Sequence, residues 1–114
     1  MTSLVTTVAD ILEASADYVR AGWTQHRPFD HVDGQLYVCA SGAMWLAAGL
    51  SRDRALRVED EPSLALWQGA VACLQTHLGD NVAGWNDSIG QTQGHVADTL
   101  LQLAKELRNN GGLT

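Results

Sequence analysis

The sequence has little positive charge: seven Lys and Arg residues stand against 13 Asp and Glu, giving a formal net charge of −6. Domains that bind nucleic acid carry a basic face that pairs with phosphate groups. Here the basic residues are scattered, and the loose group Arg52, Arg54 and Arg57 runs directly into the acidic residues at 59–61. The acidic residues are themselves spread thinly, which disfavours a protein that imitates nucleic acid. We therefore expect neither DNA nor RNA as a partner.

Cysteine and long apolar runs are also scarce. Cys39 and Cys73 are too few for a disulfide framework in a chain that is 46% hydrophobic, so two reduced and buried thiols are predicted. The N-terminal segment has no basic start and no unbroken apolar run, which disfavours a secretory signal and a membrane span. At 114 residues the chain fits one domain, residues 1–114, and we expect it to be soluble and cytoplasmic, with no membrane partner.

Helical periodicity is clearest at the start of the chain. Apolar residues recur every three or four positions over residues 3–21, which predicts an amphipathic helix capped by Thr2 or Ser3. Gly22 is predicted to take the left-handed position that commonly follows a helix. Asp33-Gly34 then lies between two short runs of β-forming residues, a pattern typical of a two-stranded hairpin.

Three further helices are predicted after the hairpin. Residues 39–50 are apolar all round and favour a central core helix that ends at Gly49. A polar segment follows, in which residues 54–56 are predicted to form one helical turn. Pro62 suits the first turn of the next helix, which runs to about residue 78 and stops at Gly79. The last helix begins near Thr92. The predicted fold is mainly α: a compact bundle of about four helices with a small β-hairpin between the first and second.

The stretch Trp85-Asn86-Asp87, with His95 a few residues later, is the segment most typical of a functional site. Asn and Asp form local turns with the backbone, a Trp anchors loops to a core, and Thr92 can cap the last helix. These properties favour the interpretation that the segment anchors the core and starts a helix. A polar recognition patch beside an aromatic anchor is the alternative, because loops carry function disproportionately often.

Three motifs together resemble a family of small uncharacterised proteins from actinobacteria and the phages that infect them. They are Trp-x-Gln (Trp23, Gln25), Cys-Ala-x-Gly-Ala (Cys39, Ala40, Gly42, Ala43) and Trp-Asn-Asp before a capped helix (Trp85, Asn86, Asp87, Thr92). The resemblance covers most of the chain, and it implies a phage or prophage setting but no activity. His95 stands where the resembling proteins often have an acidic residue, so the reciprocal capping interaction at this helix start is weakened here.

Catalytic and metal-binding patterns are weak. Cys39 at a helix start, with His26, His31 or His95 nearby, would suit a thiol hydrolase, but a small hydrophobic residue packed under the hairpin is the favoured interpretation. Cys39 and His95 are thus only weak catalytic candidates. The loop at residues 26–33 holds two His and two Asp without a second ligand pair, so no metal site and no cofactor are predicted.

The leading hypothesis is a non-enzymatic module that binds a host or phage protein. Its positive support is the presence of four Trp residues, a residue type enriched at binding hot spots. The predicted binding residues are Trp23, Gln25, Trp85, Asn86, Asp87 and His95. The other two tryptophans, Trp45 and Trp67, are predicted to lie in the core. A small thiol-dependent hydrolase that uses Cys39 with a His, and a homo-oligomeric structural unit, are the alternatives.

Overall fold

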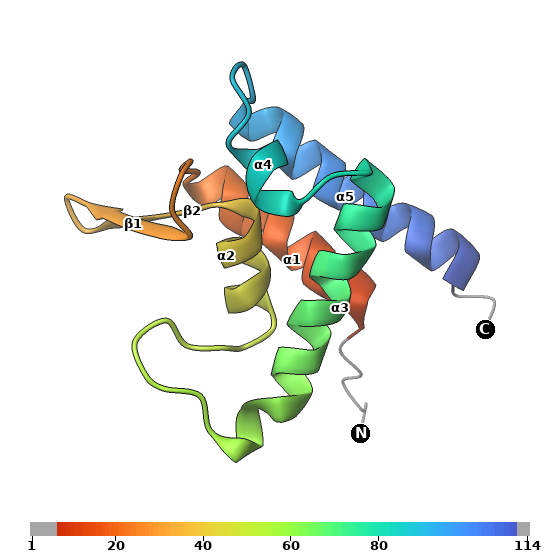
Figure 1. Cartoon of the computed structure of the whole chain (residues 1–114), viewed down its shortest axis with the longest axis horizontal. Coiled ribbons are helices and arrows are strands. Elements are labelled where there is room, and N and C mark those ends of the chain that lie inside the picture. The colour runs from red at the N-terminus through yellow and green to blue at the C-terminus, as the bar shows by residue number, and fades with distance from the viewer. Residues whose placement is uncertain (1–6, 112–114) are drawn as a thin grey trace.

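The computed structural model describes residues 7–111. In chain order the elements are α1 (Val8–Ala21), β1 (Phe29–Val32), β2 (Gln35–Val38), α2 (Ala40–Ala47), the 3₁₀ helix η1 (Val58–Asp60), α3 (Glu61–Leu78), α4 (Val82–Asn86) and α5 (Gln93–Gly111) (Figure 1). The mainly helical fold, with a hairpin between the first two helices, confirms the prediction. The short helix α4 was not predicted.

The first helix begins later than its periodicity suggested. Thr7 caps α1: its side chain accepts a hydrogen bond from the N–H of Asp10, and the Asp10 carboxylate accepts one from the N–H of Thr7. This reciprocal capping box satisfies two N–H groups that the helix itself leaves unpaired. The predicted caps, Thr2 and Ser3, lie outside the described residues.

The buried face of α1 packs chiefly against α5, and then against α2. The largest fully buried side chains of the core are Ile11, Leu12, Met44, Leu74 and Leu100. Burying an aliphatic side chain of this size contributes about 1.5–3 kcal/mol, so the core that α1, α2, α3 and α5 form together supplies much of the driving force for folding. At the edge of this contact Arg108 binds both Asp10 and Glu13.

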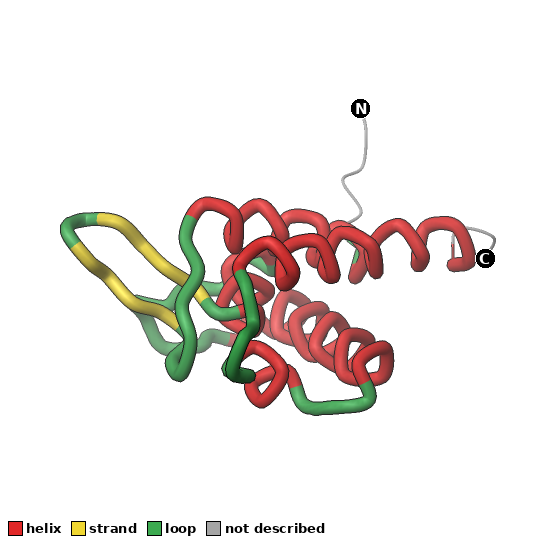
Figure 2. The backbone as a smooth tube through the Cα atoms, turned by 90° about the horizontal axis from the view of Figure 1, so that it is seen from above, coloured by secondary structure: helices red, strands yellow, loops and turns green. Residues whose placement is uncertain are grey.

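The hairpin forms where the Asp-Gly pair predicted it. Asp33 and Gly34 have φ angles of 52° and 79°, as a two-residue turn of type I′ requires, and Phe29 pairs with Val38 at the open end. The hairpin projects away from the helices (Figure 2). Because an isolated pair of strands is marginal in water, its base depends on the rest of the molecule.

The prediction for Gly22 was wrong. Its φ and ψ angles are 179° and 125°, an extended conformation. The chain leaves α1 directly into a pairing with β2, in which Val38 donates to the Gly22 carbonyl and Thr24 donates to the Val38 carbonyl. A Cβ atom on Gly22 would lie 2.6 Å from the carbonyl oxygen of Leu36, so this position needs glycine for space rather than for a left-handed turn.

The central helix α2 is shorter than predicted, and Cys39 is its N-cap rather than its first residue. The segment is also not buried all round: Met44 is fully buried, whereas Trp45 is half-buried. Gly49 follows the helix with a φ of 90°, as expected for a stop. A Cβ atom on Gly42 would collide with the Pro28 carbonyl oxygen, so this glycine lets the 26–28 segment cross the start of α2.

The two tryptophans predicted to lie in the core, Trp45 and Trp67, are half-buried and pack edge to face with ring centroids 5.1 Å apart. The Trp45 indole N–H donates to the carbonyl of Ser51, and that of Trp67 donates to the carbonyl of Ser41. The pair joins α2 to α3 and fixes the start of the loop that leads to η1.

The helical turn predicted at residues 54–56 is absent, and a 3₁₀ turn forms at η1 instead. Asp60 explains the shift, because its carboxylate accepts two hydrogen bonds from the Arg54 guanidinium, at 2.8 and 2.9 Å, and one from the N–H of Arg57. This clasp holds the chain extended before it turns into α3. Pro62 stands in the first turn of α3 and Gly79 ends that helix with a φ of 69°, both as predicted.

The clasp should make the molecule sensitive to acid. The Arg54 guanidinium and the Arg57 N–H lower the pKa of Asp60 from 3.8 to about 2. A carboxyl group whose pKa is lowered by folding adds stability that is fully present above its ordinary pKa and is lost as the pH falls through its folded value. We expect Asp60→Asn to be less stable than the wild type above pH 3.8, and the difference to shrink as the pH falls from 3.8 through about 2.

Urea denaturation across this pH range measures the effect. Asp53→Asn is the control, because Asp53 is exposed and lies 3.5 Å from Arg52 in an ion pair of the kind that contributes little. A difference between Asp60→Asn and the wild type that did not depend on pH would show that the ionised carboxylate does not hold the clasp.

Candidate functional site

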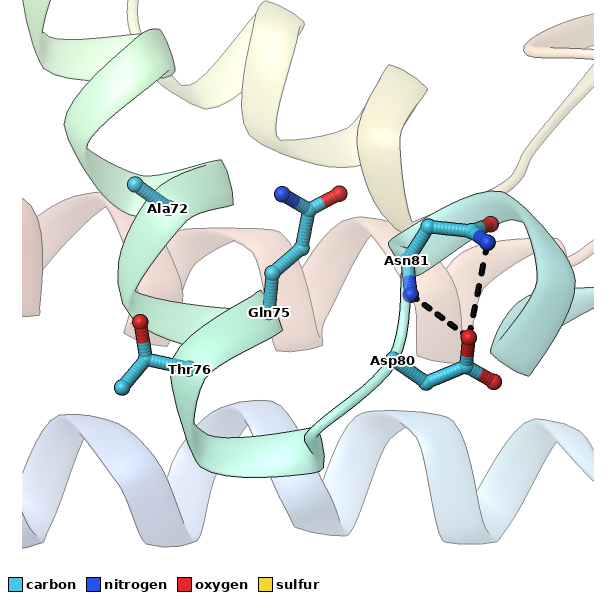
Figure 3. Close-up of a pocket in the computed structure, with 5 residues that line it drawn as sticks. All are labelled: Ala72, Gln75, Thr76, Asp80 and Asn81. Atoms are coloured by element: carbon cyan, nitrogen blue, oxygen red, sulfur yellow. Dashed lines mark hydrogen bonds between the residues drawn. The ribbon is translucent and has the colours of Figure 1, made fainter.

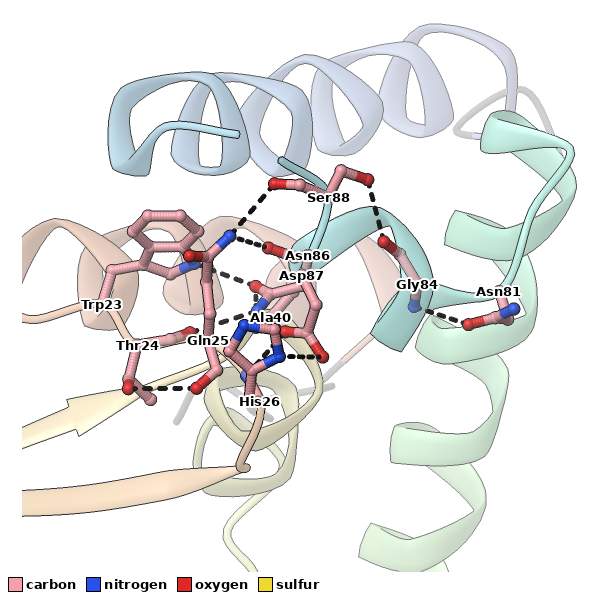
Figure 4. A network of polar contacts seen from close by, with 10 residues as sticks. All are labelled: Trp23, Thr24, Gln25, His26, Ala40, Asn81, Gly84, Asn86, Asp87 and Ser88. Atoms are coloured by element: carbon pink, nitrogen blue, oxygen red, sulfur yellow. Dashed lines mark hydrogen bonds and ion pairs between the residues drawn. The ribbon is translucent and has the colours of Figure 1, made fainter. Parts of the chain in front are cut away.

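Asn86, the last residue of α4, is fully buried and joins three separate segments of the chain (Figure 4). Its side-chain oxygen accepts hydrogen bonds from the Trp23 indole N–H at 2.9 Å and from the N–H of Ala40 at 3.0 Å. Its side-chain nitrogen donates to the Thr24 carbonyl at 3.1 Å and to the Asp87 carboxylate at 3.0 Å. All the hydrogen-bonding groups of the amide are therefore used inside the protein.

Gln25 contributes a second side-chain amide to the same junction. Its side-chain nitrogen donates to the carbonyls of Asn86, at 3.1 Å, and Ser88, at 3.2 Å. The three motifs of the sequence thus meet at one point in the fold: Trp-x-Gln, the start of Cys-Ala-x-Gly-Ala, and Trp-Asn-Asp. The local Asx turn predicted for Asn86 and Asp87 was wrong, because both side chains bond to residues far away in the sequence.

His26 and Asp87 face each other beside this junction. His26 has a φ of 70°, a left-handed conformation that is uncommon for a residue with a side chain. Its N–H donates to the Asp87 carboxylate at 2.8 Å, and its ring Nδ1 lies 3.7 Å from the other carboxylate oxygen. Burial raises the pKa of Asp87, but the hydrogen bonds from His26 and Asn86 outweigh it and leave that pKa below its ordinary value. Asp87 is therefore an anion at neutral pH.

Cys39 is 9% exposed and lies at the start of α2. Its sulfur accepts a hydrogen bond from the N–H of Gly42 at 3.3 Å. Burial, together with the charge of Asp87, raises the pKa of the thiol above its ordinary value and outweighs the N–H groups of Gly42 and Ser41, which act in the opposite direction. Cys73, the other free cysteine, is half-buried rather than buried as predicted.

A cavity of about 250 Å³ lies against these groups. It is lined by His26, Arg27, Pro28, Cys39, Ser41, Ala83, Asn86 and Asp87. The 26–28 segment, the start of α2 and the end of α4 each contribute to its wall. Of the histidines considered as partners of Cys39, His26 alone lines this cavity.

The other two histidines lie elsewhere. The ring of His31 contacts the Arg52 guanidinium, with 2.9 Å between the nitrogens. His95 stacks at a tilt against half-buried Trp85, with ring centroids 6.2 Å apart, and its N–H donates to Thr92. Thr92 thus caps α5 as predicted. Within residues 7–111 no group of three or more His, Cys, Asp or Glu is arranged to hold a metal ion.

A second depression, between the end of α3 and the start of α4, has an estimated volume of about 410 Å³ (Figure 3). Its polar side chains are already hydrogen-bonded to neighbouring residues of the protein. Asp80 accepts from Asn81, Asn81 accepts from the N–H of Gly84, and Gln75 accepts from the N–H of Val82. This depression therefore belongs to the start of α4 and has no arrangement typical of a binding site.

The turn between α4 and α5 projects at the top of the view in Figure 1. Its residue Ile89 is completely exposed. Gln91 donates its N–H to the Ser88 carbonyl at 3.0 Å, and Gly90 between them has a φ of 85°, which suits the third position of a type II turn. Sequence reasoning missed Ile89. The available signal was a single apolar residue between Ser88 and Gly90 in an otherwise polar loop.

A family of unknown function, DUF6197, matches residues 3–106. The chain belongs to this family. No curated protein and no solved structure matches the chain. Within residues 7–111, no helix combines the length and apolar character needed to cross a membrane.

The junction is expected to dominate stability. Asn86→Ala would leave the Trp23 indole N–H and the Ala40 N–H buried without acceptors, and each lost acceptor costs about 1–3 kcal/mol. We expect Asn86→Ala to lower the free energy of unfolding by about 3 kcal/mol. Urea denaturation followed by Trp fluorescence measures this change.

Asn81→Ala is the matched control, because Asn81 is exposed and caps α4 through one hydrogen bond to Gly84. Loss of such a cap costs about 1 kcal/mol. Equal losses in the two variants would contradict a central role for the Asn86 amide.

Proposed function

We propose that this protein is a phage- or prophage-type accessory protein that acts in the bacterial cytoplasm by binding a host or phage protein. The observation that carries the proposal is Ile89, a fully exposed aliphatic side chain at the apex of a hydrogen-bonded turn. Single exposed apolar residues are common on protein surfaces. What distinguishes Ile89 is how firmly its backbone is held.

The turn is held from both sides. Ser88 donates its hydroxyl to the Gly84 carbonyl at 2.8 Å, and Gln91 donates its side-chain amide to the Trp85 carbonyl at 2.9 Å. Gln25 reaches the Ser88 carbonyl from the other end of the chain. A loop already fixed in one conformation loses little entropy when a partner binds, so more of the contact energy appears as affinity.

The surroundings of Ile89 indicate the chemistry of the partner surface. From Ser88 to Val96 the sequence contains no Asp, Glu, Lys or Arg, and its polar residues are neutral amides, hydroxyls and His95. Trp85 and His95 form an aromatic pair at the start of α5, beside the turn. This surface fits a protein with an apolar pocket rimmed by uncharged hydrogen-bonding groups.

The six predicted binding residues divide into two kinds under this proposal. Trp23, Asn86 and Asp87 hold the turn from within, and Gln25 ties it to the 23–26 loop. Trp85 and His95 contribute contact area beside Ile89. The phage setting rests on the resemblance of the three motifs, and the interaction rests on the turn.

Replacing the apex side chain tests the proposal. Tagged wild type, Ile89→Asp and Val58→Asp are used to capture proteins from an actinobacterial lysate, and the captured protein is then purified and titrated directly. Val58 is 80% exposed and lies at η1, away from the turn, so it controls for a new surface charge. We expect Ile89→Asp to weaken binding by at least about tenfold, because a buried unpaired carboxylate is costly, and Val58→Asp to leave binding unchanged.

Salt gives a second criterion. With few charges at the contact, raising the salt concentration to about 1 M, where the screening length is about 3 Å, should change the affinity little. A captured protein that binds Ile89→Asp as tightly as wild type, or that dissociates in salt, would contradict the proposed surface. So would the capture of nothing but further copies of this chain.

A further inference from the structure

The cavity beside Cys39 is separate from the Ile89 turn, and the groups around it suggest chemistry. A thiol, an imidazole and a carboxylate all line it: Cys39 from the start of α2, His26 from the loop before the hairpin, and Asp87 from the end of α4. Cys39 and Asp87 follow His26 by 13 and 61 positions in the chain, so only the fold brings the three residues together. The cavity shares Asn86 and Asp87 with the junction, and Ile89 is not among its lining residues.

Cysteine is an unusual residue type for the N-cap of a helix, the position that Cys39 occupies in α2. Ser, Thr, Asp and Asn are the preferred N-caps because an oxygen accepts hydrogen bonds from the first free N–H groups of the helix. A neutral thiol is a weak acceptor, so Cys39 is a poor choice for capping alone. Burial, together with the charge of Asp87, keeps the pKa of the thiol above its ordinary value, although the N–H groups of Gly42 and Ser41 act in the opposite direction. The sulfur is therefore a neutral thiol at rest, and it needs a base to take its proton as it reacts.

His26 has a left-handed backbone conformation. Its strained backbone is held by the Asp87 carboxylate, which also lies 3.7 Å from ring Nδ1. An imidazole oriented by a carboxylate through one nitrogen has its other nitrogen, Nε2, available to take up a proton. The His26 side chain is 74% exposed, so the ring has room to turn toward the cavity.

We propose that this cavity is a thiol reaction site in which Cys39 takes an acyl group from a small activated ester or thioester, with His26 as base and Asp87 as its positioning residue. The thiol proton moves to His26 Nε2 while the sulfur bonds to the carbonyl carbon. The bond to the leaving alcohol or thiol breaks, and His26 returns the proton to that group.

Water completes the reaction. It adds to the carbonyl carbon of the acylated Cys39, its proton passes through His26 to the departing sulfur, and a carboxylic acid leaves. Atoms and charge balance without a metal or redox partner. The imidazolium formed in each step is stabilised by the neighbouring Asp87 carboxylate.

The cavity limits the substrate. Its volume of about 250 Å³ is below the range of 300–1,000 Å³ typical of drug-sized ligands. Cys39 itself is only 9% exposed, which excludes bulky acyl chains at the sulfur. Short acyl groups on a good leaving group are therefore the expected class.

Reaction with 4-nitrophenyl acetate tests the proposal. Release of 4-nitrophenolate gives the rate, and mass spectrometry of the intact and digested protein locates the acetyl group. We expect acetylation of Cys39 in preference to half-buried Cys73. His26→Asn should slow acetylation of Cys39 by at least about tenfold, since general-base catalysis contributes about 10²–10⁴. Asn tolerates the left-handed backbone but cannot accept the proton.

Three further variants serve as controls. Cys73→Ser and His31→Asn should react within about twofold of wild type, below the smallest effect of a base. Cys39→Ser keeps a good N-cap and should abolish acetylation while it leaves the thermal midpoint unchanged or higher. Ile89→Asp should react like the wild type, which separates this result from the test of the interaction surface.

Selective acetylation of Cys39 that depends on His26 supports the site. Equal acetylation of Cys39 and Cys73, a rate unchanged in His26→Asn, or a folded protein that does not react would each overturn it. Because the wild-type labelling pattern and the His26→Asn rate do not involve Cys39→Ser, the test stands even if that variant fails to fold.

Discussion

The side-chain amide of Asn86 is the interaction on which the rest of the structure depends. It offers two acceptor sites and two donors, and the protein uses all of them: an indole N–H, a backbone N–H at the start of α2, a loop carbonyl and a carboxylate. No other short side chain presents donors and acceptors side by side in this way. Because hydrogen bonds are stronger in a dry interior and unpaired groups are costly there, the junction has one low-energy arrangement. The positions of α4, of the 88–91 turn and of His26 all follow from it.

The three motifs therefore describe a joint between segments of the chain. The polar side-chain groups of Trp23, Gln25 and Asn86 are hydrogen-bonded to one another and to nearby backbone. Around this joint lie two surfaces of different character, a neutral turn with an exposed Ile89 and a small cavity lined by Cys39, His26 and Asp87. A fixed joint is useful to both, since each needs groups held in place by a part of the chain distant in sequence.

Local signals were sufficient for most of the fold. Asp33-Gly34, Pro62, Gly79 and Thr92 act through their own backbone or the next helical turn, and each lies where the sequence predicted it. The predictions failed where a distant group decided the outcome. Gly22 is extended because β2 pairs with it, and η1 replaces the predicted turn because Asp60 holds Arg54 and Arg57. The helix α4 has only five residues, too few for a periodic pattern.

The candidate site was foreseen in part for the same reason. Trp23, Gln25, Asn86 and Asp87 were predicted from the resembling motifs and from residue type, but a sequence cannot reveal that an Asn side chain will be enclosed and fully paired. The partnership of His26 with Asp87 spans 61 positions and leaves no local signature. His95 was singled out by its neighbours in the sequence, and it lies with Trp85 rather than with Cys39.

The pairing of the first helix with the last has a consequence for biosynthesis. The apolar face of α1 is covered chiefly by α5, so the core cannot close while the ribosome is still adding residues before 93. At about 5–20 residues per second, a helix with Ile11 and Leu12 uncovered waits several seconds in the nascent chain. During that interval the growing chain presents a surface of the kind that chaperones bind. Closure of the core therefore waits for α5, and its yield in a cell is tied to what covers α1 until α5 has been synthesised.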